Sequence, residues 1–227
     1  MREAYGCGSC AAAERAVAVE EVRLHDVPVL FVSAPCGAGG HQRLLTSLLA
    51  RLHGDDAAPA CEPGNAGLAL AHDRWGRPTL VDRRTGAEAA LGISYTHGPR
   101  RSWAALARGC RVGIDTADAI DFGLPYPYRR VFTDKELGRV MSLHGGQQPS
   151  AAAHLWAIKE AAVKALGCGF HTFDYREVEV LARIPGAGGL LFAVAVGDAT
   201  VIAWTRRDQS AWLALAVAGP QAVQERV

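Results

Sequence analysis

The chain has 227 residues, of which 49% are hydrophobic, and it carries a formal net charge of +1. This length accommodates one large domain or two small ones with substantial cores. A nucleic-acid-binding protein would carry a basic face, so the near-neutral charge argues against that class. No apolar run reaches the roughly 18 to 20 residues of a membrane span. Residues 1–15 lack the order of a signal peptide, so we expect a cytoplasmic protein with no membrane partner.

The N-terminal part predicts two strands followed by a helix. Residues 16–24 alternate apolar and polar side chains and 27–32 form an apolar run, both typical of strands. A glycine-rich loop at 34–41 precedes an amphipathic helix whose leucines are 44, 45, 48, 49 and 52. Strand, glycine-rich loop and helix are the parts of a phosphate-binding loop, but no Lys-Ser or Lys-Thr pair follows the glycines. A tight turn is the favoured interpretation.

The six cysteines are scattered along the chain, as expected of reduced thiols. Cys7 and Cys10 form a CxxC pair, but no second pair follows at metal-ligand spacing. A zinc or redox role for the pair is therefore not favoured.

The middle of the chain predicts short strands joined by turns. A connection rich in Pro, Gly and Asp at 55–65 leads to the apolar residues 66–71 and a turn at 74–78. Residues 91–96 and 103–107 indicate two strands, and 111–115 indicate a short strand that ends on the carboxylate of Asp115. A capping box from Thr133 to Glu136 predicts a helix through Leu143.

Residues 150–167 predict one long helix with a chemical face. Ser150 is the expected N-cap, and Gly167 is the expected residue just past the C-terminus. At about 100° per residue, Trp156, Glu160 and Lys164 form a row along one edge of the apolar arc. The row also has a structural interpretation, because Glu160 and Lys164, four residues apart, would form a surface ion pair.

Two observations favour a functional interpretation of this helix. Lys159 falls inside the apolar arc, where an unpaired ammonium is costly. Lysine is also rare: of the 24 lysines and arginines in the chain, only three are lysines, at positions 135, 159 and 164. A compact, rotatable ammonium is one reason to prefer lysine over arginine at a phosphate.

The C-terminal part predicts four more strands. Residues 177–182, 190–196, 199–205 and 211–218 alternate like strands, and 185–189 and 206–209 supply turns. Each half of the chain therefore contains one or two helices and strands that form hairpins. The predicted fold class is α+β rather than a doubly wound parallel sheet.

Three segments, at this spacing, resemble successive signatures of the 4′-phosphopantetheinyl transferases. They are Val112-Gly-Ile-Asp115, Phe132-Thr-Asp-Lys-Glu-Leu137 and the stretch from Leu155 to Gly169, which contains WxxKExxxK. The turn from Trp75 to Pro78 and the pair Ile93-Ser94 resemble the family's glycine-lysine-proline turn and serine-histidine strand. The similarity is to the long, surfactin-synthetase-activating type, and it runs from about Trp75 to the C-terminus.

The resemblance implies a monomer of two similar α+β halves, residues 1–108 and 109–227, related by a pseudo-twofold axis. It implies that coenzyme A binds in the cleft between the halves with magnesium on its pyrophosphate. The implied reaction moves the phosphopantetheine arm onto a serine of an acyl or peptidyl carrier protein and releases adenosine 3′,5′-bisphosphate. Polyketide, nonribosomal peptide or fatty acid synthases would supply the carrier protein.

The resemblance also implies site residues. Asp115 and Glu160 are hard oxygen ligands suited to magnesium, and Glu160 is the candidate general base. Lys164 would steady the departing phosphate and completes the catalytic set. The predicted coenzyme A contacts are Arg43, Arg77, Ser94, Tyr95, His97, Lys159 and Lys164.

The sequence departs from the family's pattern at three places. The acidic residue common two positions after Asp115 is Ala117 here, and strand alternation puts Asp118 on the opposite face, so we do not expect Asp118 to bind the metal. Tyr95 stands where the family has histidine, with His97 two residues on; either is a candidate contact to the 3′-phosphate, or both are structural. The basic helix usual near the N-terminus is represented by Arg43 alone.

Two other functions stay open at this stage. The chain could be a non-catalytic relative that binds coenzyme A or a carrier protein, or a structural α+β domain whose Lys/Glu helix is a solvated face. Carrier proteins present an acidic helix, so a basic or aromatic edge is expected on the enzyme. We nominate Tyr126, Tyr128, Arg129 and Arg130 for this edge.

Overall fold

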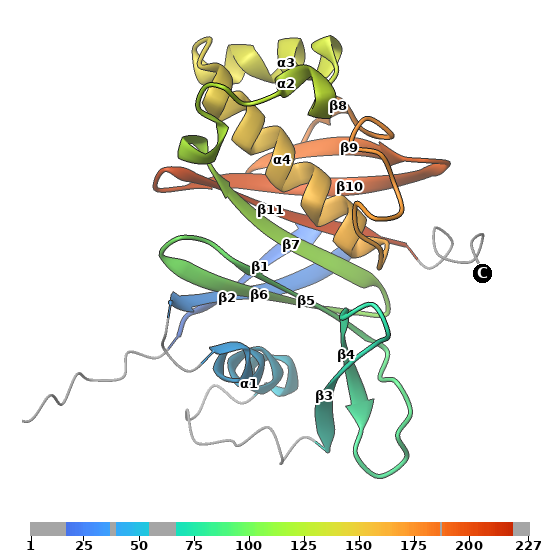
Figure 1. Ribbon diagram of the computed structural model, residues 1–227. Coiled ribbons are helices and arrows are strands. Elements are labelled where there is room, and N and C mark those ends of the chain that lie inside the picture. The colour runs from blue at the N-terminus through green and yellow to red at the C-terminus, as the bar shows by residue number, and fades with distance from the viewer. Residues whose placement is uncertain (1–16, 37–39, 55–66, 187, 220–227) are drawn as a thin grey trace, which may run out of the picture.

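The computed structural model describes residues 17–36, 40–54, 67–186 and 188–219 (Figure 1). Its N-terminal half is an antiparallel sheet in the order β1-β2-β6-β5, with one long helix, α1 (Gly40–His53). The strands are β1 (Val19–Leu24), β2 (Val27–Pro35), β5 (Leu91–His97) and β6 (Arg101–Arg108). A separate hairpin, β3 (Leu68–His72) with β4 (Pro78–Asp82), precedes β5.

The C-terminal half is a five-stranded antiparallel sheet in the order β7-β11-β10-β9-β8. Its strands are β7 (Arg111–Asp118), β8 (Val178–Ile184), β9 (Leu190–Val196), β10 (Ala199–Asp208) and β11 (Ala211–Ala218). The helices between β7 and β8 are α2 (Tyr128–Val131), α3 (Asp134–Met141), α4 (Gln148–Ala165) and the short 3₁₀ turns Ala119–Phe122 and Ser142–His144. Within the described residues, no helix is both long and apolar enough to cross a membrane.

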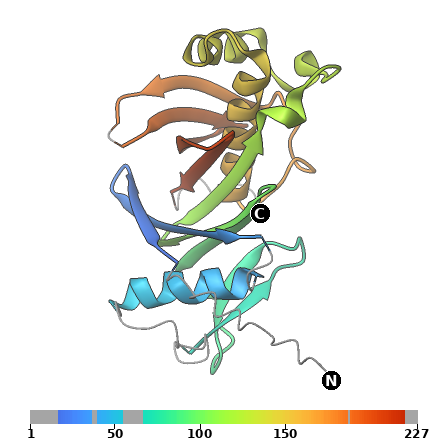
Figure 2. The ribbon, with the colours of Figure 1, turned by 90° about the vertical axis from the view of Figure 1, so that its left-hand side faces the viewer.

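The two sheets pack face to face, with α1 on the outside of one and α4 on the outside of the other (Figures 1 and 2). Strand alternation explains this order, because successive side chains point to opposite faces. In β2, Val29 and Phe31 contribute to the core between the sheets, whereas Leu30 and Val32 face α1. Strands that are buried on both faces read as continuous apolar runs, as 27–32 does.

The core between the sheets joins the two halves. It contains Phe31 and Trp103 from the N-terminal sheet and Trp204 and Leu215 from the C-terminal sheet. Arg206 of β10 pairs with Glu20 of β1, and its guanidinium lies 5.0 Å from the ring centre of Phe31. Apolar burial is the dominant stabilising contribution in such an interface, and the exposed ion pair adds little.

The edge strands β5 and β7 lie side by side where the halves meet. The hydroxyl of Ser94 in β5 accepts a hydrogen bond from the backbone N–H of Ile114 in β7, at 3.2 Å. On the other face of β7, only glycine fits at position 113, because a Cβ there would lie 1.9 Å from the carbonyl oxygen of Ala161. This glycine brings α4 against β7 and so brings their polar side chains together.

The α+β fold class is confirmed, and the predicted strands and long helices are present. Three details differ. Helix α4 begins at Gln148 with Gln147 as N-cap, so Ser150 lies inside the helix, where its hydroxyl contacts His144 Nδ1 at 2.9 Å. Strand β7 continues past Asp115 to Asp118, because it pairs with β11 over its whole length. Strand β4 and the short helix α2 were not predicted, since neither has enough residues for a clear periodicity.

Several predictions are not tested by the described residues. Cys7, Cys10, the middle of the glycine-rich loop and the whole 55–65 connection lie outside them. The pseudo-twofold relation stays a prediction. The predicted boundary between residues 108 and 109 falls in the turn between β6 and β7.

Candidate active site

The row predicted on the long helix is the partly exposed stripe of α4. From Ala151 to Ala165, every residue of the helix is buried except Trp156, Glu160 and Lys164. The remaining faces of the helix pack in the core of the C-terminal half. Glu160 and Lys164 line a cavity between the halves, whereas Trp156 stacks on Phe170. Periodicity in the sequence therefore predicted the chemical face correctly.

Asp115 of β7 and Lys164 of α4 form an ion pair beside this stripe. The ammonium Nζ lies 2.6 Å from Asp115 Oδ1, and Thr96 of β5 donates its hydroxyl to the same oxygen at 2.9 Å. The side chain of Lys164 is 30% exposed and that of Asp115 is 9% exposed. Lys164 thus pairs with Asp115 across two elements, and the alternative of a local surface pair between Glu160 and Lys164 is wrong.

Burial makes the two carboxylates of this site unusual. Desolvation raises the pKa of Asp115, although Lys164 and the Thr96 hydrogen bond oppose the shift. Desolvation also raises the pKa of Glu160, and the negative charge of Asp115 adds to that rise. The two carboxylates therefore lie close enough to repel each other, and the charge of Lys164 partly offsets the rise in pKa at both.

A cavity of about 410 Å³ extends from these charges along the junction of the halves. Glu160 and Lys164 line one end of it. Of the residues predicted to bind coenzyme A, Arg77, Ser94, Tyr95, His97 and Lys164 line the cavity. The geometry thus brings together most of the predicted set from β5, α4 and the turn before β4.

The far end of the cavity holds unsatisfied polar atoms. Among the described residues, neither Nε2 of His41 nor the hydroxyl of Tyr95 has a hydrogen-bond partner, although both atoms are buried. The two rings stack with centres 4.3 Å apart, and the ring of His97 lies 4.5 Å from that of His41. A buried polar atom without a partner costs free energy, so this end of the cavity is suited to a polar ligand. Burial, followed by repulsion from His97 and His72, lowers the pKa of His41.

Two residues of the predicted set lie elsewhere. Lys159 is fully buried, and its ammonium donates to the Glu136 carboxylate and to the carbonyls of Val131 and Tyr175. These contacts give Lys159 a structural role in tying α4 to α3, while its role in coenzyme A binding stays a prediction. Arg43 lies on α1 and is not among the described residues that line the cavity.

The residues of the predicted carrier-protein edge separate into two kinds. Tyr128 is buried and donates its hydroxyl to the carbonyl of Phe122, and Tyr126 is half-buried against the same core. Arg129 and Arg130 are exposed. Beside them, Leu124 is 91% exposed, so the surface that a partner could contact combines basic and apolar groups.

The donor set fits a magnesium ion with two protein ligands. Within the described residues there is no group of three or more His, Cys, Asp or Glu side chains that could hold a metal. Asp115 and Glu160 repel one another in a partly desolvated place, which a divalent cation would relieve. Magnesium commonly takes one or two carboxylates and completes its shell with substrate phosphates and water.

The carboxylate of Asp118 makes structural contacts, and the prediction that it does not bind the metal stays a prediction. Its carboxylate accepts the N–H of Ile120, which begins the following 3₁₀ turn, and the hydroxyl of Ser210 at 2.5 Å. Ala117 packs in the core of the C-terminal half. No described carboxylate therefore replaces the acidic residue that this position lacks.

Several residues of the cavity were not predicted from the sequence. His41, His72 and His171 line it, and Trp75, quoted above only as part of a motif, stacks on His171 with ring centres 5.5 Å apart. These residues come from separate elements, so no local spacing connects them. The one available signal for His41 was its position at the end of the glycine-rich loop, where α1 begins.

Comparisons with known proteins match the C-terminal half of the chain. Residues 111–218, from the start of β7 to the end of β11, match the family model of the 4′-phosphopantetheinyl transferase superfamily. A holo-[acyl-carrier-protein] synthase of Streptococcus suis is 38% identical over 73 residues, which are 32% of this chain and 59% of that protein. A protein of the same name from Streptococcus thermophilus is 41% identical over 59 residues, 26% of this chain and 50% of its own.

The matched segment contains both elements of the β7–α4 pair, with Asp115 and Glu160. Residues 111–218 match the 4′-phosphopantetheinyl transferase superfamily, in agreement with the resemblance found in the sequence. The chain spans between half and three fifths of the length of the relatives it matches. The long, surfactin-synthetase-activating subtype stays a prediction.

Proposed function

We propose that this protein transfers the 4′-phosphopantetheine group of coenzyme A to a serine of an acyl or peptidyl carrier protein. The observation that carries the proposal is that Glu160 and Lys164 line a cavity between the halves, where Lys164 pairs with the buried Asp115. The family match and the names of the relatives support transfer to a carrier protein. Magnesium, coenzyme A and the cytoplasm are the proposed cofactor, substrate and location.

The two carboxylates and the ammonium have different roles in the proposed reaction. Bound magnesium, held by Asp115 and Glu160, would neutralise charge on the phosphate oxygens. Glu160 accepts the proton of the carrier serine, and its raised pKa brings it closer to the basicity a general base needs. Lys164 donates to a diphosphate oxygen, and Asp115 with Thr96 fixes where that ammonium stands.

The proposed transfer forms one P–O bond and breaks another. The serine oxygen attacks the phosphorus that carries pantetheine, and a new P–O bond forms. The bond from that phosphorus to the bridging oxygen breaks, and adenosine 3′,5′-bisphosphate leaves. The unsatisfied atoms of His41 and Tyr95, with His97, are suited to the 3′-phosphate at the far end of the cavity.

Release of adenosine 3′,5′-bisphosphate tests the proposal. The protein is incubated with magnesium, coenzyme A and an apo carrier protein, and the nucleotide products are separated by chromatography. We expect release that requires all three components and stops when the carrier serine is replaced by alanine. Binding of coenzyme A without release for any of several carrier proteins would instead identify a non-catalytic relative.

A further inference from the structure

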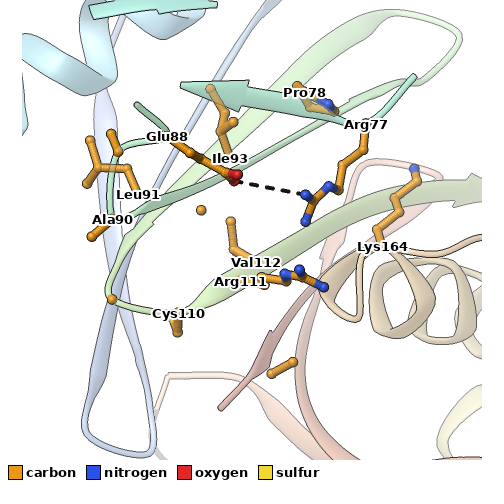
Figure 3. Close-up of a pocket in the computed structure, with 14 residues that line it drawn as sticks. Arg77, Pro78, Glu88, Ala90, Leu91, Ile93, Cys110, Arg111, Val112 and Lys164 are labelled. Atoms are coloured by element: carbon orange, nitrogen blue, oxygen red, sulfur yellow. Dashed lines mark ion pairs between the residues drawn. The ribbon is translucent and has the colours of Figure 1, made fainter. Parts of the chain in front are cut away.

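A second cavity, of about 360 Å³, adjoins the proposed catalytic one. Arg77, Pro78, Ile93 and Lys164 line both. The second cavity lies between the segment before β5, the β6–β7 turn and the end of α4 (Figure 3). Its remaining wall is mostly apolar, and its cations gather near the boundary with the first cavity: Arg77, Arg111 and Lys164.

Arg77 and Arg111 converge on one point at this boundary. Arg111 is the first residue of β7, and its Nη1 donates to the carbonyl of Leu166 at 2.9 Å, at the negative end of α4. A Cβ on Gly167 would lie 2.8 Å from Arg111 Nη1 and 2.9 Å from Arg77 Nη1. Gly167, with φ of 75°, therefore caps the helix and leaves the space that both guanidinium groups occupy.

The two guanidinium groups are incompletely compensated. Arg77 pairs with Asp73 at 3.0 Å and approaches Glu88 at 3.9 Å, but the Glu88 side chain is 61% exposed and contributes little. Arg111 forms no ion pair within the part of the chain that the structure describes. Burial, then the charge of Arg77, lowers the pKa of Arg111, although Glu88, Cys168 and Asp73 partly oppose the shift. An anion between the two groups would supply the missing negative charge, and paired guanidinium forks match phosphate oxygens.

We propose that Arg77 and Arg111 together bind a phosphate, which makes Arg111 a further substrate-binding residue. The inference rests on the proposed function and assigns the phosphate of the diphosphate that stays with adenosine. Glu160, Lys164 and Gly167 follow one another along α4 and its end, so the attacked phosphate lies by Glu160 and its neighbour lies toward the arginines. The His41 and Tyr95 end is left for the 3′-phosphate.

This assignment gives Arg111 a part in the chemical step. When the bond to the bridging oxygen breaks, that oxygen leaves on the adenosine-side phosphate, which gains one negative charge. Two guanidinium groups already in place stabilise that charge more strongly than the starting diphosphate. Loss of Arg111 therefore weakens both binding and turnover.

Calorimetric titration of coenzyme A and of 3′-dephospho-coenzyme A into wild type and Arg111→Met tests the proposal. We expect both ligands to lose roughly tenfold or more in affinity, because a charge-assisted contact to a phosphate common to both is removed. Arg139→Met is the matched control, because Arg139 also donates to a backbone carbonyl, that of Val180 at 2.8 Å, and does not line either cavity. The control should bind both ligands as wild type does.

The other outcomes overturn the proposal in distinguishable ways. Unchanged affinities in Arg111→Met would show that Arg111 only caps α4, and a loss confined to coenzyme A would assign it to the 3′-phosphate instead. Wild type that binds neither ligand would contradict the proposed function itself. If Arg111→Met does not fold, Arg111→Lys keeps the charge but loses the fork, and it should still weaken both ligands by the same factor.

Discussion

Asp115 and Glu160 illustrate how much the surroundings of a carboxylate decide its chemistry. Burial raises the pKa of both side chains, but Asp115 accepts hydrogen bonds from Lys164 and Thr96, whereas Glu160 lines the cavity. The ion pair with Lys164 favours the charged form of Asp115, and the place of Glu160 at the cavity allows it to exchange a proton with a ligand. Their roles differ although both residues are acidic and both line the same junction.

Replacing Glu160 with glutamine should abolish transfer while the fold survives. The amide keeps the shape of the side chain but can neither take a proton nor neutralise a cation. We expect turnover to fall by at least about a hundredfold, the range for loss of a general base. Thermal unfolding of the variant should match that of wild type. Normal turnover in Glu160→Gln would refute the assignment.

Asp118→Ala should behave in the opposite way. Its carboxylate caps the turn after β7 and accepts from Ser210, so its loss should lower the free energy of unfolding by about 1 kcal/mol. Magnesium-dependent turnover should change by less than about tenfold. Steady-state kinetics beside Asp115→Ala check this, and equally deep losses in both variants would show that Asp118 is a ligand.

Residues on one periodic element were predictable, and those that meet only in three dimensions were not. The Trp156, Glu160 and Lys164 row followed from helical spacing, and the burial of Lys159 followed from the same arc. The partner of Lys164 was not predictable, because Asp115 is 49 positions away and only the β7–α4 contact at Gly113 brings them together. Arg111 was missed for the same reason.

At the scale of elements, α4 is held from inside by two polar clusters as well as by apolar packing. Lys159 joins α4 to α3 through Glu136, and the fully buried His154 joins it to β10 through Thr205. Such buried polar groups are costly unless every one is satisfied, so they favour one position of the helix over others. The position of the chemical stripe depends on this.

Lys159→Met should destabilise the protein strongly. The change leaves the Glu136 carboxylate buried without its cation, and breaking a buried pair in this way costs about 3 to 5 kcal/mol. Denaturant unfolding measures the loss. We expect the folded fraction to bind coenzyme A with wild-type affinity, and a selective loss of affinity in a stable variant would instead support the predicted ligand contact.

The histidines of α4 and its neighbouring turn should make stability depend on pH. Burial lowers the pKa of His154 well below its ordinary value, and burial also lowers that of His144. The unfolded chain therefore binds more protons than the folded chain below about pH 6.5. The contribution of these histidines to the free energy of unfolding is fully present above that pH and falls as the pH decreases. The slope approaches about 1.4 kcal/mol per pH unit for each such proton.

His154→Gln isolates this contribution. Glutamine can keep hydrogen bonds to Thr205 and His144 but does not titrate. The free energy of unfolding, measured between pH 7 and pH 5, should decline less steeply in the variant than in wild type. Parallel curves would show that His154 is not the titrating group.

For the whole molecule, the site depends on both halves. The family match covers the C-terminal half alone, which contributes Asp115, Glu160 and Lys164, while the N-terminal half brings Arg77, Tyr95 and the other cavity residues. The α+β class followed from hairpin patterns and turns. The four-layer stacking did not, because it depends on which faces of β2, β6, β7 and β11 pack together.

The exposed basic edge should govern recognition of the carrier protein. Charge reversal at Arg129 and Arg130 should raise the KM for an acidic carrier protein more than the KM for coenzyme A, and most at low ionic strength. Arg183→Glu on β8 is the control, because that arginine is also exposed but lies outside the proposed edge. An equal effect of the Arg129 and Arg130 reversals on both substrates would count against the edge.

The intact mass of a carrier protein tests the central claim most directly. An apo acyl or peptidyl carrier protein is incubated with coenzyme A, magnesium and either wild type or Glu160→Gln, and is then weighed by mass spectrometry. The proposed function predicts that wild type adds the mass of one phosphopantetheine group at the carrier serine and that Glu160→Gln adds none. An unchanged carrier mass with folded wild type, across several apo carrier proteins, would contradict it.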